Sequence, residues 1–196
     1  MISGFWRKPI MQRSFLVDKT YREMVDEKLS TNSSEIFGNF SPEHAGYIIA
    51  QFISKAQRSI EILSGSFADT FYEGIDIEPL LKQAADRLYS NNGQIRIITI
   101  NGERCNKLEA IANRINGENR QVIAYIPAQC NDPDKVNHFM VVDDRLYRLE
   151  ELHEVKPEGQ TPECVKAEVC CNGPQKAAAL RNRFDTVWNQ ISSPQE

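Results

Sequence analysis

The pattern of apolar and polar positions from residue 41 onward alternates between the helical and the strand period. Apolar residues recur three and four positions apart from Ala45 to Ala56, behind Ser41 and Pro42, which suit a helix N-cap and first turn. Short apolar runs over 59–63, 95–100 and 122–126 predict strands, and helical spacing predicts helices over 80–88 and 108–115. This alternation predicts parallel strands joined by right-handed crossovers.

The pattern changes after Pro127. Two short apolar runs, 136–142 and 146–149, are joined through Asp143 and Asp144 and predict an antiparallel hairpin. A further strand is predicted over 165–171, and Pro174 opens a last helix with an apolar face that reaches Ile191. We therefore predict an α/β fold with a mixed sheet and helices on both of its faces.

The first 40 residues have a weaker pattern. Apolar positions between Tyr21 and Leu29 predict one short helix, and the first 24 residues carry five basic and two acidic side chains. We predict an N-terminal arm over 1–40 and one domain over 41–196. The arm is a candidate contact for a protein partner or a nucleic acid, and a loosely packed extension is the alternative.

Composition narrows the class of protein. The 196 residues are 41% hydrophobic and 26% charged, and the net charge of −4 disfavours a surface built entirely for nucleic acid. No apolar run approaches the roughly 20 residues that cross a bilayer, and no apolar segment follows Arg7 and Lys8 as in a signal peptide. We expect a cytoplasmic protein that does not enter a membrane.

Cysteines and histidines limit the chemistry. Five cysteines without a Cys-x-x-Cys pair indicate neither a disulfide framework nor a zinc site, and the apolar run around Cys170 and Cys171 predicts buried thiols. We expect no cofactor and no metal. His138 lies in the predicted hairpin, where its face alternates with that of Phe139, and a buried structural histidine is the alternative to a functional one.

A second group of polar residues closes the hairpin. An imidazole, a guanidinium and two carboxylates fall within six residues where the second strand ends, a place where α/β folds often build sites. A solvated loop with salt links is the alternative. The candidate ligand-binding residues are His138, Arg148, Glu150 and His153, and the candidate catalytic residues are His138, His153, Asp143 and Glu151.

The order of elements over 41–191, the Val-Val-Asp-Asp hairpin and the closing Phe-x-x-x-Trp helix resemble a single phospholipase D-like domain. Active members of that superfamily use a His-x-Lys-x4-Asp motif, in which the histidine attacks phosphorus and the lysine holds phosphate oxygens. Because two histidines are needed, single-domain members pair two chains. The resemblance therefore implies a homodimer.

The sequence departs from this motif in either register. With His138 on the motif histidine, Met140 takes the lysine position and Arg145 the aspartate position. If the hairpins are aligned instead, Val136 takes the histidine position, His138 the lysine position and Asp143 the aspartate position. His153 then falls where active members have an asparagine. We prefer the second register, in which no nucleophile remains.

Two hypotheses follow. The first is a catalytically degenerate module that binds a phosphate-bearing ligand, a nucleic acid or a protein in a regulatory role. The second is a phosphodiesterase or nuclease with a rebuilt site, in which His138 and His153 of two chains are oriented by Glu150, Glu151 or Asp143. The absent lysine and the acidic net charge favour the first.

Overall fold

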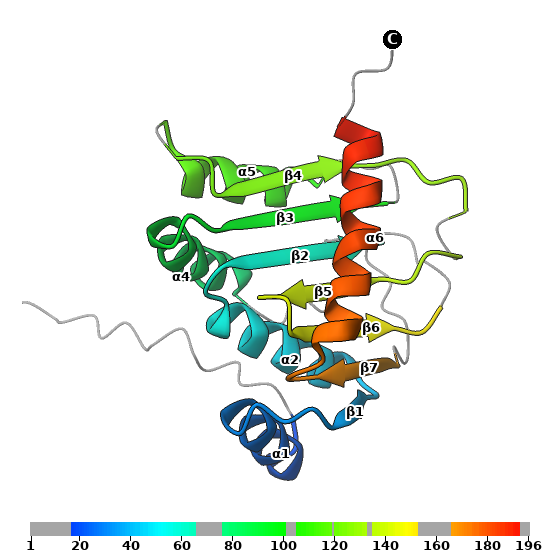
Figure 1. Ribbon diagram of the computed structural model, residues 1–196. Coiled ribbons are helices and arrows are strands. Elements are labelled where there is room, and N and C mark those ends of the chain that lie inside the picture. The colour runs from blue at the N-terminus through cyan, green and yellow to red at the C-terminus, as the bar shows by residue number, and fades with distance from the viewer. Residues whose placement is uncertain are drawn as a thin grey trace, which may run out of the picture.

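The computed structural model describes residues 17–65, 76–100, 105–118, 120–132, 135–152 and 166–192. Its elements carry the labels of Figure 1. In chain order they are α1 (Lys19–Ser30), β1 (Ile36–Asn39), α2 (Pro42–Lys55), β2 (Ser59–Ser64), α4 (Ile77–Ser90), β3 (Gln94–Thr99), α5 (Asn106–Asn116), β4 (Ile123–Pro127), β5 (Phe139–Val142), β6 (Leu146–Glu150), β7 (Ala167–Cys170) and α6 (Pro174–Ser192).

The strands form one seven-stranded mixed sheet in the order β1-β7-β6-β5-β2-β3-β4. Strands β2, β3 and β4 pair in parallel, whereas β5 runs antiparallel to β2 and the rest of the sheet continues antiparallel to β1. The prediction of a mixed sheet is confirmed, as are the parallel strands and the hairpin.

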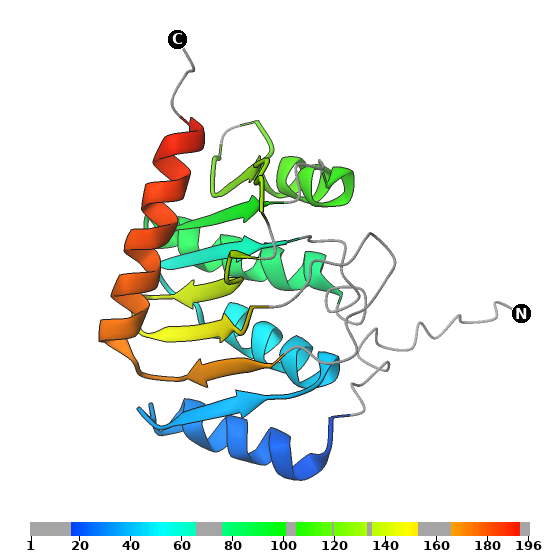
Figure 2. The same cartoon turned by 90° about the vertical axis from the view of Figure 1, so that its right-hand side faces the viewer.

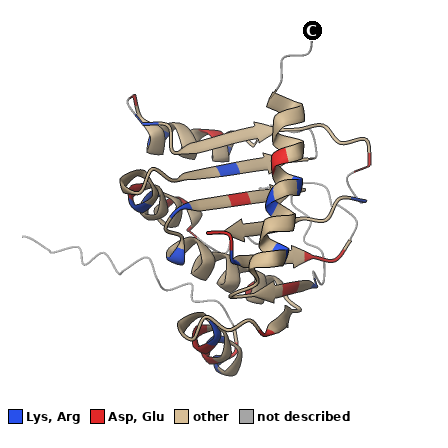
Figure 3. Ribbon diagram, in the orientation of Figure 1, with Lys and Arg blue, Asp and Glu red and all other residues tan. Residues whose placement is uncertain are grey.

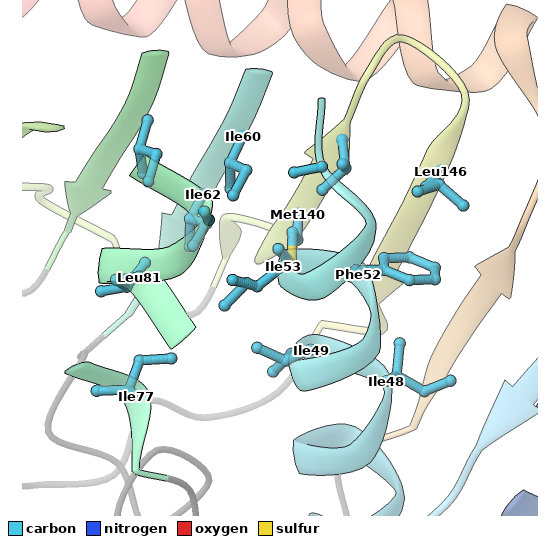
Figure 4. Close-up of a cluster of buried hydrophobic side chains, with 14 of the residues drawn as sticks. Ile48, Ile49, Phe52, Ile53, Ile60, Ile62, Ile77, Leu81, Met140 and Leu146 are labelled. Carbon is cyan, nitrogen blue, oxygen red and sulfur yellow. The ribbon is translucent and has the colours of Figure 1, made fainter. Parts of the chain in front are cut away.

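Helices cover both faces of the sheet, as the sequence predicts. In Figures 1 and 2, α6 crosses one face alone, while α2, α4 and α5 lie on the other. Ile48, Ile49, Phe52 and Ile53 of α2 pack with residues of α4 and the sheet in the main core (Figure 4). Phe184 of α6 belongs to a second cluster on the opposite face. This division agrees with the alternation of side chains along β5.

Local signals explain where the elements begin and turn. The Ser41 side chain accepts a hydrogen bond from the His44 backbone N–H and caps α2, with Pro42 in the first turn. Between β5 and β6, Asp143 and Asp144 both have positive φ, 53° and 59°. Two such central residues make the turn type that matches the twist of paired strands.

The strand β1 is the main addition to the predicted elements. Ile36–Asn39 pairs with β7 at one edge of the sheet, and Val25 of α1 is completely buried in the main core. Four residues with two polar or glycine positions give no clear strand period, so pairing with β7 decides their conformation. Residues 17–39 therefore pack onto the sheet and its helices.

Three further features of the described residues concern the cysteines, membrane-spanning helices and groups that could hold a metal ion. Cys170 and Cys171 are buried, as predicted, and burial raises the pKa of the Cys171 thiol to about 11. Within the described ranges, no helix has the length and apolar character needed to cross a bilayer. The same residues contain no group of three or more histidine, cysteine, aspartate or glutamate side chains placed to hold a metal ion.

Candidate functional site

A row of buried polar residues crosses four strands near the end of the sheet where the parallel strands finish. Residue 138 immediately precedes β5, and its carbonyl accepts a hydrogen bond from the Glu150 N–H at 2.9 Å. Glu150 pairs with Ala167 of β7, which in turn pairs with Asn39 of β1. The register therefore places His138, Glu150 and Asn39 in one line across the sheet.

Arg148 connects this row. Its Nε donates to Asn39 Oδ1 at 2.7 Å, and its Nη1 pairs with Glu150 Oε1. The second carboxylate oxygen of Glu150 lies 3.2 Å from His138 Nδ1. Because β7 carries the small side chain of Ala167 between β6 and β1, the Arg148 guanidinium can reach across that strand. We call Asn39, Arg148, Glu150 and His138 the polar cluster.

Every member of the polar cluster is buried. Arg148 is 3% exposed and His138 6%, and a buried ion pair is tolerated only where hydrogen bonds compensate for lost hydration. Glu150 supplies that compensation, because its carboxylate contacts both the guanidinium and the imidazole. The Nη2 of Arg148 makes no hydrogen bond within the part of the chain that the structure describes.

Helix α1 borders the polar cluster. The Tyr21 hydroxyl donates to the Gly38 carbonyl at 3.1 Å, one residue before Asn39. Burial raises the pKa of Tyr21, and the positive charge of Arg148 opposes that shift. The helix of the predicted arm thus forms part of the surroundings of the cluster.

The sequence candidates separate into two groups. The structure brings His138, Arg148 and Glu150 together. Asp143 lies at the other end of β5, about 16 Å from residue 138 at the rise of a strand. Its carboxylate accepts hydrogen bonds from three backbone N–H groups, those of Gln57, Arg58 and Ser59, at 2.7 to 3.0 Å. Asp143 therefore fastens the hairpin to the start of β2 and does not orient His138.

The remaining candidates lie outside the polar cluster or outside the described residues. Glu151 follows β6, is exposed, and donates its backbone N–H to the Lys166 carbonyl at 2.9 Å. His153 lies outside the described residues, as do the basic Arg7, Lys8 and Arg13 of the predicted arm.

Sequence reasoning missed Asn39. The residue sits in the segment predicted as an arm, next to glycine and between aromatic residues, where an isolated asparagine usually indicates a turn. Only the pairing of β1 with β7 brings its side chain to Arg148, which lies 109 positions later in the chain.

The arrangement offers a cation, a carboxylate and an imidazole in one place. A carboxylate beside Nδ1 orients an imidazole and favours the tautomer in which Nε2 is the basic nitrogen. A guanidinium is a good partner for carboxylate and phosphate oxygens. The cluster has the groups for anion recognition and, in principle, for proton transfer.

Comparison with solved structures identifies the fold. Nuc from Salmonella typhimurium, a phospholipase D family member, has a TM-score of 0.55 and 21% identity over 80% of this chain and 95% of its own. NucT from Helicobacter pylori has a TM-score of 0.53 and 13% identity over 79% of this chain and 97% of its own. The archaeal chromatin protein TrmBL2, described as showing a novel mode of DNA binding, has a TM-score of 0.56 and 12% identity. The match covers 88% of this chain and 60% of TrmBL2.

No protein-family model matches this sequence, and no curated protein matches it at the sequence level. The resemblance therefore rests on the path of the chain. The structural match covers nearly the full length of Nuc and NucT. The chain has a phospholipase D-like fold, as its sequence pattern indicates.

Proposed function

We propose that this chain is a catalytically degenerate phospholipase D-like module that forms a homodimer and binds a phosphate-bearing ligand at the polar cluster in a regulatory role. The observation that carries the proposal is the buried Arg148 guanidinium, whose Nη2 has no hydrogen-bond partner among the described residues. A guanidinium donor in a poorly solvated place is suited to an anionic oxygen.

Two features argue against hydrolysis by the family mechanism. Val136 stands where the preferred register requires the nucleophilic histidine. In addition, Glu150 neutralises Arg148, so the cluster has little net positive charge with which to stabilise a phosphoryl transition state. Binding of an anion needs only a donor, whereas catalysis needs a nucleophile and compensating charge.

One observation favours the second hypothesis, a rebuilt phosphodiesterase. His138 Nδ1 lies 3.2 Å from Glu150 Oε2, an arrangement that activates histidine in many hydrolases. His138 would then be the nucleophile or base, Arg148 the cation, and a second histidine would be required as the acid.

Calorimetric titration with inorganic phosphate tests the binding proposal. We expect the wild type to bind phosphate and Arg148→Met to bind it at least about tenfold more weakly, since a charge-assisted hydrogen bond is lost. The variant His138→Gln removes the imidazole, keeps a polar side chain and leaves Arg148 in place. It therefore measures the contribution of the imidazole to phosphate binding apart from that of the guanidinium. Arg114→Gln is the matched control, because Arg114 is an exposed arginine paired only with Glu78 among the described side chains.

Hydrolysis of bis(p-nitrophenyl) phosphate and of an oligonucleotide, with and without Mg²⁺ or Mn²⁺, separates the two functions. The degenerate module gives no turnover above the buffer rate. Turnover that disappears in His138→Ala would establish the rebuilt enzyme instead. Equal phosphate affinity in wild type and Arg148→Met, with both proteins folded by circular dichroism, would refute ligand binding at the cluster.

A further inference from the structure

A second polar site lies at the opposite end of the sheet. A groove of about 730 Å³ is lined by the starts of β2 and β3, the end of α4, the residues before β4 and one residue of α6. This volume falls within the range of small-molecule sites, roughly 300 to 1,000 Å³. The hairpin turn at Asp143 lies at this end of the sheet, and the length of β5 separates the groove from the polar cluster.

Arginines dominate the charge of the groove. Arg58, Arg96 and Arg181 line it, and Glu61 is the only acidic residue among its described lining. Charged positions of both signs gather on β2, β3 and α6 where the helix crosses the sheet (Figure 3). Three arginines and one carboxylate therefore line this concave surface, and two of the arginines also contact carboxylates outside the lining, Asp144 and Asp185.

The buried carboxylate of Glu61 holds two of these arginines in place. Its Oε1 lies 3.2 Å from Arg96 Nη2, and its Oε2 lies 2.8 Å from Arg181 Nη2. Arg96 also contacts Asp185 at 2.7 Å, and Arg181 contacts Asp144. The Nε atoms of both arginines are buried without a hydrogen-bond partner within the described ranges, and carboxylates hold the terminal nitrogens, so both guanidiniums are fixed charges in the wall of the groove.

Arg58 is the groove arginine for which no carboxylate partner is found among the described residues. It is exposed, and its only side-chain contact there is a 3.4 Å hydrogen bond from Nη2 to the Asp143 carbonyl. Three backbone hydrogen bonds to Asp143 from Gln57, Arg58 and Ser59 fix the segment that carries it. A guanidinium on a fixed backbone is suited to an incoming phosphate.

The groove also has a surface for an aromatic ring. Tyr89 at the end of α4 is 53% exposed, and the Arg120 guanidinium lies over its ring at 5.4 Å. Gln94 and Gln121 belong to the same lining. Nucleobases bind by stacking on aromatic rings and guanidiniums and by hydrogen bonds from amides.

We propose that this groove binds a nucleotide unit, with Arg58 and Arg181 on the phosphate and Tyr89 against the base. The unit is either a free nucleotide or one nucleotide of a single strand, since both present the same base and phosphate. The site is independent of the polar cluster and of the function proposed for it.

Fluorescence anisotropy with a labelled oligothymidylate and calorimetry with AMP test this proposal. We expect Arg58→Glu and Tyr89→Ala to weaken binding about tenfold each, because one loses a phosphate contact and the other a stacking surface. Arg181 is not substituted, because its removal would leave Glu61 with one cationic partner fewer. The control Arg114→Gln removes an exposed arginine outside the groove and should leave binding unchanged.

The outcomes separate the two sources and the two sites. Competition by AMP assigns the groove to free nucleotides, whereas binding of the oligothymidylate alone assigns it to a single strand. His138→Gln should leave either form of binding unchanged. Absence of binding to both probes, or binding that only His138→Gln weakens, would overturn the proposal. Equal affinity of folded Arg58→Glu and Tyr89→Ala with the wild type would also overturn it.

Discussion

Three backbone N–H groups point at the carboxylate of Asp143, which is 4% exposed. At this residue the chain adopts a positive φ, a conformation that aspartate and asparagine tolerate better than most residues. The same side chain therefore shapes the turn and satisfies donors that would otherwise be buried without acceptors. Its hydrogen bonds give Asp143 a structural role in the hairpin.

We predict that Asp143→Ala lowers the free energy of unfolding by about 3 kcal/mol, because buried N–H groups lose their acceptors and alanine is strained at positive φ. Asp143→Asn keeps one acceptor oxygen and tolerates the turn, so we expect a smaller loss. Urea denaturation measures both. A variant Asp143→Ala as stable as the wild type would contradict this prediction and would show that water accepts the hydrogen bonds in place of the carboxylate.

At the scale of elements, α1 and β1 complete one side of the molecule. The Tyr21 ring of α1 stacks on the His44 ring of α2 with centroids 3.6 Å apart and an interplanar angle of 3°. Tyr47 of α2 donates its hydroxyl to Asp26 of α1 at 2.6 Å. The two helices are thus joined by an aromatic contact and a hydrogen bond, and both contribute residues to the main core.

This contact predicts a pH dependence. Burial lowers the pKa of His44, although Asp18 and Glu43 oppose the shift, so the folded protein favours the neutral imidazole. The stabilising contribution is complete above the unfolded pKa of about 6.5 and is lost as pH falls through the lower pKa of the folded state.

Urea midpoints between about pH 7.5 and pH 5 measure this effect. His44→Phe keeps an aromatic ring against Tyr21 and cannot titrate, so we expect its stability to fall less than that of the wild type over this interval. Identical pH profiles for the two proteins would contradict the assignment.

At the scale of the whole molecule, the two ends of one sheet carry different chemistry. The end where the parallel strands finish holds a compensated cluster, in which Glu150 contacts both Arg148 and His138. The other end holds a groove where arginines outnumber carboxylates in the described lining. The length of β5 lies between them, so a substitution in the groove can be made without touching the polar cluster.

The homodimer is a prediction at this scale. Each chain carries one copy of the hairpin region, so the two-histidine chemistry of the family that it resembles would need a second chain. Light scattering at micromolar concentration should give about twice the 22.4 kDa of one chain. A mass of one chain would refute the dimer and would also remove the rebuilt enzyme that draws its second histidine from a partner.

Periodicity alone was sufficient for the larger elements. The helical spacing from Ala45 to Ala56 predicts α2, and the β-branched run from Ile95 predicts β3, because burial of one face or one strand imposes a pattern on the sequence itself. The hairpin followed from two apolar runs and an Asp-Asp turn. The order of these elements then limited the sheet to few arrangements, since crossovers are short and right-handed.

The sequence by itself determined the α/β class, the main elements and the resemblance to phospholipase D-like domains. Only the tertiary structure decided that β1 pairs with β7, that Asn39 meets Arg148, and that Asp143 lies away from His138. It also assembled the groove from β2, α4, β3 and α6. The physical reason is that periodicity records which face of an element is buried, whereas contacts between distant residues depend on strand register and packing.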